Sequence, residues 1–384
     1  MVLRTCLSCM LIAASVTGCS EQTENHDDLF QAELDRIVSS KFDWTPGISM
    51  SVYAPSSHID WSGQAGVFEL STFADVSDNQ PFRIASITKS FTAVSILRLH
   101  EEGLLSIDDP IQKHISDQHD SILVSGGYDT NQISIRHCLN STSGIYDYVL
   151  GTRENPSPYV SIIANDPNRR WTRTDQLKGA IEWGEPQGNA GEKYHYSDTG
   201  YILLGEIIER LSNKSLGDAM EYLVNYKRLG LHSTWLESLQ EARTETEPIH
   251  SYYQRKDYSL YDASIDLYGG GGLISTTQDL SRFYYHLFNG GVFENNSTTD
   301  LMLSRTEELV KDNAEAESED YRLGVQHIQL YDSCIYAHSG LWDTYVLYSP
   351  KHNAAVAVKF TDGGGDYLLK RVISIIENIL ESNS

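Results

Sequence analysis

The stretch Ser86-Ile-Thr-Lys89 is the only Ser-x-x-Lys in this chain of 384 residues, and it decides how the sequence is interpreted. It opens the run SITKSFTAVSILRLHEEG at residues 86–103, which predicts one helix ending at Gly103. The apolar positions that carry the helical pattern are Phe91, Val94, Ile96, Leu97 and Leu99. Residues three apart share a helix face, so Ser86 and Lys89 are expected to point into the same space.

Ser86 and Lys89 fit the chemistry of an activated nucleophile. A serine hydroxyl is a weak nucleophile until a neighbouring group takes its proton, and a lysine one turn away either does this or lowers the pKa of another base. A helix N-terminus also offers backbone N–H groups to an oxyanion. The alternative is a surface serine beside an ordinary helical lysine, and so short a motif does not decide between them.

Two further motifs follow in chain order. Tyr196-Ser-Asp198 lies inside GEKYHYSDTGYILLGEIIERLS, and His338-Ser339-Gly340 lies inside YAHSGLWDTYVLYSP. Together with Ser-x-x-Lys they resemble the three elements of the penicillin-recognising serine enzymes, in which a Tyr or Ser motif and then Lys- or His-x-Gly on a strand follow the nucleophile.

The sequence around these motifs also resembles that of the same enzymes. The matching blocks, in order, are RIASITKSFTAVSILRLHEEGLLSIDDPI, ISIRHCLNSTSGIYDY, YGGGGLISTTQDLSRFYYHLFNGG and YRLGV. From about Phe30 to the C-terminus the chain therefore resembles the class C β-lactamase and D-alanyl-D-alanine carboxypeptidase family, also called the β-lactamase-related serine hydrolases. That fold hosts several hydrolases, so the resemblance does not name one substrate.

The resemblance implies a role for each motif. Ser86 attacks a carbonyl and forms an acyl-enzyme, which water then releases. Tyr196 is the expected proton shuttle, and the ammonium of Lys89 is expected to lower the pKa of this phenol. Lys89 and Tyr196 would then act as one coupled acid–base unit.

The expected oxyanion hole consists of the backbone N–H groups of Ser86 and Leu341. Leu341 follows His338-Ser339-Gly340 directly. Gly340 is expected to let its strand come close to the substrate.

We expect neither a cofactor nor a metal, since no Cys/His spacing is typical of a zinc site.

Three positions depart from the pattern of the family. Asp198 stands where most members carry Asn, and an ionised carboxylate cannot donate a hydrogen bond to a substrate amide. Asp198 is also expected to hold Lys89 protonated, which favours Tyr196 as the base. His338 replaces the usual Lys of β-lactamases, and a partly charged imidazole binds a carboxylate less reliably. Ser141 replaces a common His.

These departures argue against an efficient β-lactamase and leave several functions open. The leading hypothesis is a serine hydrolase that acts on a D-amino-acid peptide, amide or ester, so its partner is a small-molecule or peptide substrate. The alternatives are a carboxylesterase of the same fold and a slow-turnover penicillin-binding lipoprotein. A non-enzymatic lipoprotein that only binds a ligand in the cleft is a further alternative, supported by Asp198.

The predicted fold class is α+β, with the β-lactamase/transpeptidase-like arrangement. A helix is expected in DLFQAELDRIVSSKF, a strand pair in GISMSVYAP and SHIDWSGQAGVF, and a final helix in GDYLLKRVISIIENILES. Strands at both ends of the chain must pair, which predicts an antiparallel sheet flanked by the terminal helices. The α/β lobe is expected at about residues 29–85 and 246–384, and an inserted α-helical lobe at about 86–245.

The N-terminus predicts export and lipid anchoring. Residues 1–18 combine a short basic region with an apolar stretch, and Val16-Thr-Gly-Cys19 resembles the cleavage site of bacterial lipoproteins. Cys19 would then carry the lipid, residues 19–28 would form a polar tether, and residues 29–384 the hydrolase domain. Ser20 rather than Asp after Cys19 favours the periplasmic face of the outer membrane. The alternative is an ordinary secretory signal cut elsewhere.

The composition is strongly acidic, with a formal net charge of −24. Such a charge argues against nucleic acid and against anionic lipid surfaces as partners. After removal of residues 1–18, Cys138 and Cys334 remain beside Cys19. They could pair in an oxidising compartment, but their apolar contexts favour two buried free thiols.

Overall fold

The computed structural model describes residues 26–41, 45–253, 256–305, 320–330, 333–363 and 365–381. The expected signal peptide and Cys19 lie outside the described residues. The first described helix, α1 (His26–Ser39), begins three residues before the expected start of the domain.

A seven-stranded antiparallel sheet within the described residues joins the two ends of the chain, in the order β2-β1-β12-β11-β10-β9-β8. Its strands are β1 (Gly47–Ala54), β2 (Ile59–Gly66), β8 (Asp320–Tyr321), β9 (Gln326–Leu330), β10 (Ser333–Gly340), β11 (Thr344–Ser349) and β12 (Ala354–Phe360). β1 pairs with β12 in the register Ile48↔Phe360 to Tyr53↔Ala355. The expected pairing of N-terminal with C-terminal strands is therefore confirmed.

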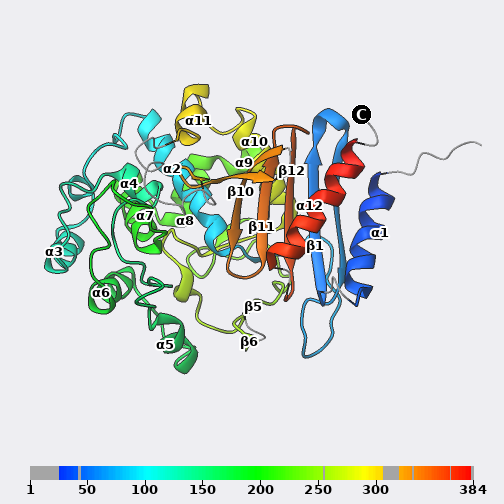
Figure 1. Ribbon diagram of the computed structural model, residues 1–384, viewed down its shortest axis with the longest axis horizontal. Coiled ribbons are helices and arrows are strands. Elements are labelled where there is room, and N and C mark those ends of the chain that lie inside the picture. The colour runs from blue at the N-terminus through cyan, green and yellow to red at the C-terminus, as the bar shows by residue number, and fades with distance from the viewer. Residues whose placement is uncertain are drawn as a thin grey trace, which may run out of the picture.

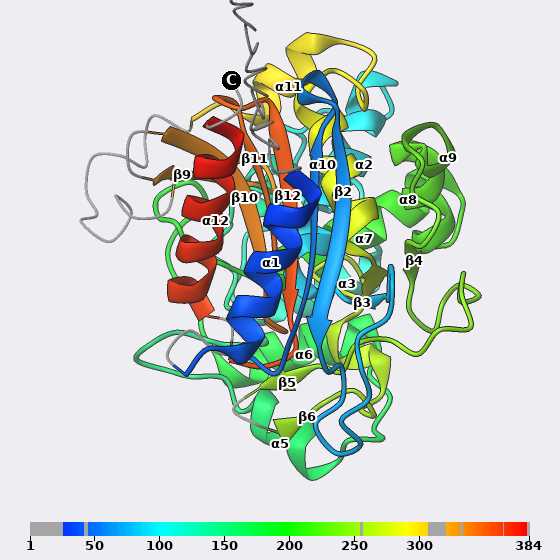
Figure 2. The ribbon, with the colours of Figure 1, turned by 90° about the vertical axis from the view of Figure 1, so that its right-hand side faces the viewer.

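Helices cover both faces of this sheet. α1 and the C-terminal α12 (Gly365–Glu381) lie side by side on one face, in front of the strands in Figure 2. Buried side chains such as Phe30, Val356 and Ile376 form the core beneath them. On the other face, α10 (Thr277–Phe288) packs against β1, β11 and β12. Each face of the sheet is thus shielded from water by an amphipathic helix.

A helical lobe lies beside the sheet, with α2 (Thr88–Glu101) between the two (Figure 1). The other helices of this part are α3 (Asp117–Ser125), α4 (Ile135–Leu139), α5 (Tyr159–Asn165), α6 (Arg173–Trp183), α7 (Asp198–Ser212), α8 (Leu216–Val224) and α9 (Tyr226–Leu229). α11 (Asn296–Met302), from the C-terminal half of the chain, also packs against α2.

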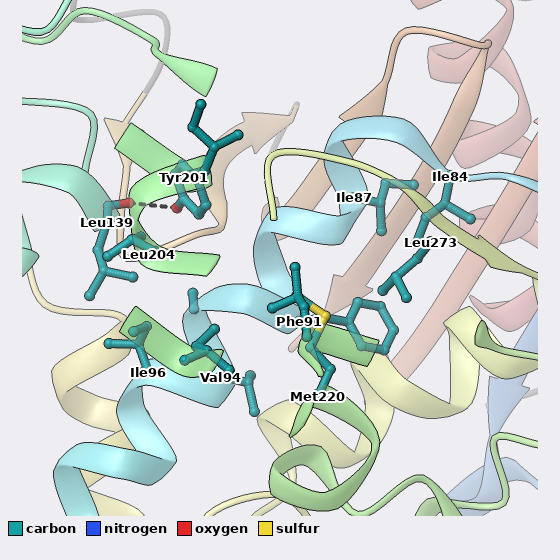
Figure 3. Close-up of a cluster of buried hydrophobic side chains, with 14 of the residues drawn as sticks. Ile84, Ile87, Phe91, Val94, Ile96, Leu139, Tyr201, Leu204, Met220 and Leu273 are labelled. Atoms are coloured by element: carbon teal, nitrogen blue, oxygen red, sulfur yellow. Dashed lines mark hydrogen bonds between the residues drawn. The ribbon is translucent and has the colours of Figure 1, made fainter. Parts of the chain in front are cut away.

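α2 is buried on all sides, which makes it the hub of the larger core. Figure 3 shows Phe91 and Val94 of α2 among apolar side chains of other elements, including Met220 and Leu273. The hydroxyl of Tyr201 in α7 donates a hydrogen bond to the Leu139 carbonyl at 2.7 Å, so this buried phenol is satisfied. The packing fixes the start of α2, where Ser86 and Lys89 lie.

The predicted α+β fold class is confirmed, with one local difference. A small sheet in the order β3-β7-β4 contains β4 (Trp235–Leu236), which lies inside the range expected to be helical. Its partners are β3 (Phe82–Arg83) and β7 (Leu273–Ser275), and β3 leads directly into the Ser86 turn. The remaining pair, β5 (Tyr252–Tyr253) and β6 (Lys256–Asp257), forms a separate hairpin.

Candidate active site

Ser86 lies in a tight turn rather than at the first residue of the α-helix. A 3₁₀ turn, Ala85–Ile87, precedes α2, which begins at Thr88. Ala85 has φ +44°, a left-handed conformation that is uncommon for a residue with a Cβ. Such strain occurs where the surrounding structure over-determines the backbone. Here it sets the direction in which Ser86 leaves the turn.

Lys89 is fully buried and reaches back toward Ser86. Its Nζ donates to Ser86 Oγ at 3.0 Å, to Asp198 Oδ1 at 2.5 Å and to the Gly270 carbonyl at 2.8 Å. An ammonium has three N–H groups, and this arrangement gives each of them an acceptor. The structure therefore brings Ser86 and Lys89 together, as their spacing predicts, and holds the lysine as a cation.

Tyr196 lies at the same point, in the loop that leads into α7, and the neighbouring Ser86 side chain acts to lower the pKa of its phenol. Lys89 Nζ lies over the face of the phenol ring, 4.8 Å from its centroid. Burial and then the carboxylate of Asp198 raise the pKa of Tyr196 well above its usual value. The expected low pKa is wrong, because burial and then the charge of Asp198 outweigh the positive charge of Lys89.

Asp198 is the first residue of α7 and is buried against Lys89. Its own backbone N–H donates to Asp147 Oδ1 at 3.2 Å. Asp147 also accepts from the backbone N–H groups of Val149 and Leu150, at 3.1 and 3.2 Å. Burial, and then the charge of Asp198, raise the pKa of Asp147 to about 7.

His338 lies on β10 and is buried. Its Nδ1 is 2.8 Å from the Ser339 carbonyl oxygen, which can only accept, so Nδ1 carries the proton. Nε2 is then the acceptor for the hydroxyl of Tyr321, 3.0 Å away. Burial, followed by the charge of Lys89, lowers the pKa of His338 to about 3. The expected partly charged imidazole is instead a neutral one at physiological pH, with both nitrogens engaged.

Gly340 permits a close approach between the end of β10 and the turn that carries Ser86. A Cβ built on Gly340 would fall 2.3 Å from the Ile84 carbonyl oxygen and 3.1 Å from the Ala85 Cβ. The hydroxyl of Thr344 donates to the same Ile84 carbonyl at 3.2 Å. The end of β10 is therefore pressed against the turn that carries Ser86.

The two expected oxyanion donors flank this contact. Within the described residues, neither the backbone N–H of Ser86 nor that of Leu341 donates a hydrogen bond. Both residues line one cavity of about 320 Å³. An N–H group that faces a cavity without a partner is available to an oxyanion.

The cavity in front of Ser86 has a mainly apolar and aromatic lining that also contains three carboxylates. Its apolar and aromatic lining includes Val149, Leu150, Tyr159, Ile163, Ile265, Tyr258, Trp342 and Tyr345. Its charged lining consists of Asp198, Asp266 and Asp343, and no Lys or Arg occurs among the described residues that line it. Tyr196, His338, Ser339 and Gly340 also face it, so the predicted site residues, apart from the buried Lys89 and from Cys19, surround a single space.

Three residues of the site were not predicted. Asp147 lies in the GIYDY block and Asp266 lies two residues before the YGGGG block, so each is in or next to a matching block but belongs to no motif. Tyr321 opens the YRLGV block. Only the fold shows that these side chains meet the predicted ones.

Several other expectations concern the rest of the chain. Cys138 and Cys334 are both free thiols, but only Cys138 is buried. Cys334 lies at the start of β10 on the face opposite buried Ile335, where side chains alternate, and it is exposed. Among the described residues no group of His, Cys, Asp or Glu is arranged to hold a metal ion, and no helix is long and apolar enough to cross a membrane.

Comparison with known families gives one extended match, to the Beta-lactamase family over residues 34–373. Among curated proteins, penicillin-binding protein 4* of Bacillus subtilis (strain 168) is 26% identical over 238 residues, which cover 58% of this chain and 48% of the relative. Protein flp of Staphylococcus aureus (strain MRSA252) is 30% identical over 202 residues, or 52% of this chain and 34% of the relative. The chain thus spans about half or less of the length of these curated relatives.

Solved structures show the same fold over nearly the whole chain. A D-stereospecific amidohydrolase from Streptomyces sp. superposes with a TM-score of 0.74 at 25% identity, covering 91% of this chain and 97% of that one. A D-amino acid amidase from Ochrobactrum anthropi SV3 has a TM-score of 0.68 at 21% identity, covering 92% and 99%. The resemblance predicted from the three motifs is confirmed: this chain belongs to the Beta-lactamase family and has its serine-hydrolase fold.

Proposed function

We propose that this protein is a serine hydrolase that forms an acyl-enzyme on Ser86 with amides, esters or short peptides of D-amino acids and hydrolyses β-lactams poorly. The observation that carries the proposal is the contact of Ser86 Oγ with Lys89 Nζ at 3.0 Å, at the wall of a cavity that also exposes two free backbone N–H groups. The similarity to a D-stereospecific amidohydrolase supports the class of substrate.

The reaction starts with the transfer of the Ser86 hydroxyl proton to Tyr196, in the fraction of molecules in which this phenol is ionised. Ser86 Oγ then bonds to the substrate carbonyl carbon, and the oxyanion accepts hydrogen bonds from the N–H groups of Ser86 and Leu341. Collapse of this intermediate breaks the C–N or C–O bond, and Tyr196 returns the proton to the leaving amine or alcohol. Water hydrolyses the acyl-enzyme by the same steps.

Electrostatics supports poor activity toward β-lactams. Penicillins, like peptides with a free C-terminus, carry a carboxylate that needs a cation or several hydrogen-bond donors. The cavity offers three Asp side chains, no Lys or Arg among its described lining residues, and a neutral His338 whose Nε2 is occupied by Tyr321. A carboxylate entering this space would lose its hydration without a partner.

A panel of substrates tests the proposal. We expect hydrolysis of D-phenylalanine amide and its methyl ester faster than of the L-enantiomers, faster than of a chromogenic cephalosporin, and none by Ser86→Ala. Hydrolysis of p-nitrophenyl acetate without any D-amino-acid substrate would favour the carboxylesterase instead. A stable penicilloyl adduct in the intact mass, without turnover, would favour the slow penicillin-binding lipoprotein.

A further inference from the structure

Asp266 is a carboxylate in the catalytic cavity that the mechanism above does not use. It is the last residue of the 3₁₀ turn Ala263–Asp266, and its side chain lines the cavity that contains Ser86. It also lines a small neighbouring pocket with Ala85 and Trp342. Asp266 is therefore close to the backbone that presents the nucleophile.

The cations near Asp266 are already paired with other carboxylates. Arg83 and Lys89 both act electrostatically on Asp266. Arg83 forms a two-pronged ion pair with Glu237, at 2.8 and 2.9 Å. Lys89 is paired with Asp198 and has its three N–H groups occupied.

Among the described residues Arg83 forms no hydrogen bond to Asp266. Two further N–H groups of Arg83 donate to the carbonyl oxygens of Tyr258 and Tyr261, at 2.8 and 3.0 Å. Within the described residues no donor forms a hydrogen bond to the carboxylate of Asp266. Asp147, by contrast, accepts from three backbone N–H groups and is satisfied.

Asp266 and the Lys89–Asp198 pair lie next to two consecutive glycines, Gly271 and Gly270. A Cβ built on Gly271 would fall 2.0 Å from Asp266 Oδ1, and one built on Gly270 would fall 2.5 Å from Asp198 Oδ1. The carbonyl of the same Gly270 accepts from Lys89. The two carboxylates therefore lie against adjacent glycines, and both contribute to the wall of the cavity.

A carboxylate in this position is costly without a cation. Burial, and then the charge of Asp198, raise the pKa of Asp266 to about 7. A substrate that brings a positive charge to this wall would supply the missing partner, and a substrate that brings a negative charge would be repelled.

We propose that Asp266 binds the free α-ammonium group of the substrate, so that the enzyme acts on amino-terminal D-residues with an unblocked amine. This inference rests on the proposed function and names the substrate class more narrowly. The apolar lining of the cavity would take the side chain of the same residue, and the Ser86 turn its carbonyl. The specificity is therefore that of an amino-acid amidase or aminopeptidase rather than of a carboxypeptidase.

Two matched substrates test the proposal, D-phenylalanine amide and N-acetyl-D-phenylalanine amide, which differ in the charge of the α-nitrogen. At pH 7.5 the wild type is expected to prefer the unblocked amide. Asp266→Asn is expected to lower kcat/KM for this amide roughly 10- to 100-fold, the usual effect of a lost charged hydrogen bond, and to leave the acetylated one within about twofold. Asp266→Glu should restore part of the preference. Asp60→Asn, which removes an exposed charge on β2, is the control and should change neither.

The pH dependence and the thermal stability give readouts that a merely structural role would not produce. In the wild type the ratio of the two kcat/KM values is expected to rise toward pH 7, as Asp266 ionises, and to fall again above about pH 8, where the α-ammonium of the unblocked amide loses its proton. The rise toward pH 7 should be absent from Asp266→Asn. The folded pKa is raised, so the cost of the charge is present above pH 7 and is lost as the pH falls. Asp266→Asn should therefore melt at a higher temperature than the wild type at pH 8, with the difference vanishing near pH 4.

Two results would overturn the inference while the proposed function stands. One is equal loss on both amides in Asp266→Asn, and the other is a wild type that hydrolyses the acetylated amide as fast as the unblocked one. Failure of the proposed function is distinct, because it would appear as no turnover of any D-substrate or as activity that survives in Ser86→Ala.

Discussion

Lys89 Nζ lies 2.5 Å from Asp198 Oδ1 and 3.0 Å from the hydroxyl oxygen of Ser86, so one buried cation joins the nucleophile to a carboxylate. The side chains of Lys89 and Asp198 are 0% and 7% exposed, which means that neither charge is screened by water. A buried pair of this kind makes each partner essential to the other, since removal of one leaves an uncompensated charge. It also sets the acid–base behaviour of Tyr196.

Asp198→Asn is predicted to shift the pH dependence of acylation toward lower pH. The carboxylate of Asp198 raises the pKa of Tyr196, so its removal lowers that pKa and increases the ionised fraction of the phenol at a given pH. The acid limb of kcat/KM for an ester substrate should therefore move to lower pH. The amide of Asn also supplies an N–H₂ donor, so amide substrates should gain more than esters.

Folding of the Asp198→Asn variant must be checked by thermal melting first, because breaking a buried pair typically costs about 3–5 kcal/mol. An acid limb that stays in place or moves to higher pH, in a folded variant, would show that Tyr196 is not the proton acceptor. Equal gains on amide and ester would show that Asp198 acts only through charge.

Because His338 is buried and neutral, the free energy of unfolding is predicted to fall as the pH is lowered. Its folded pKa of about 3 lies below the unfolded value of 6.5, so its contribution is intact above pH 6.5 and is lost as the pH falls toward 3. At pH 5 this residue should reduce the free energy of unfolding by about 2 kcal/mol relative to neutral pH. Denaturant titrations from pH 7 to pH 4 should therefore show a shallower decline in unfolding free energy for His338→Gln than for the wild type. Parallel curves would refute the assignment of a neutral, buried imidazole.

Gly340→Ala is predicted to impair catalysis through the backbone. The added Cβ would collide with the Ile84 carbonyl oxygen and displace the turn that presents Ser86. We expect a loss in kcat of roughly tenfold or more and a destabilisation of about 1–3 kcal/mol. Gly103→Ala is the control, since a Cβ there meets nothing within 4 Å and only its positive φ opposes the change. A fully active Gly340→Ala variant would show that β10 does not position the nucleophile.

The N-terminal sequence leads to a prediction about location. If Cys19 is lipidated, Cys19→Ala should abolish incorporation of labelled palmitate and release the protein from the membrane fraction. Wild-type protein found only in the aqueous fraction would contradict the lipid anchor, as would label on the variant.

Short sequence motifs were enough to predict the start of the nucleophile helix and the first hairpin. The spacing of Ser86 and Lys89 places both on one side of a helical start, and the turn residues after Ala54 mark the hairpin that β1 and β2 form around Pro55–Ser57. The Asp198–Lys89 pair was expected from the motif, and the contact at 2.5 Å bears this out.

What the sequence did not predict depends on contacts between distant segments. The left-handed Ala85 lies in a turn that packs against Gly340 of β10 and Thr344 of β11, more than 250 residues later along the chain. His338 is neutral because the fold buries it and brings Tyr321 to its Nε2. The isolation of Asp266 arises because Glu237 and Asp198 take the nearby cations, and no local pattern indicates such a competition.

The central claim, that Ser86 is the acylated nucleophile, is tested most directly by intact-protein mass spectrometry after treatment with a fluorophosphonate. We predict a single adduct that maps to the peptide containing Ser86. The adduct should be absent from Ser86→Ala and retained in Ser95→Ala, a buried serine on the same helix whose hydroxyl donates to the Phe91 carbonyl. A wild type that stays unlabelled, or a Ser86→Ala variant that carries the same adduct, would contradict the account.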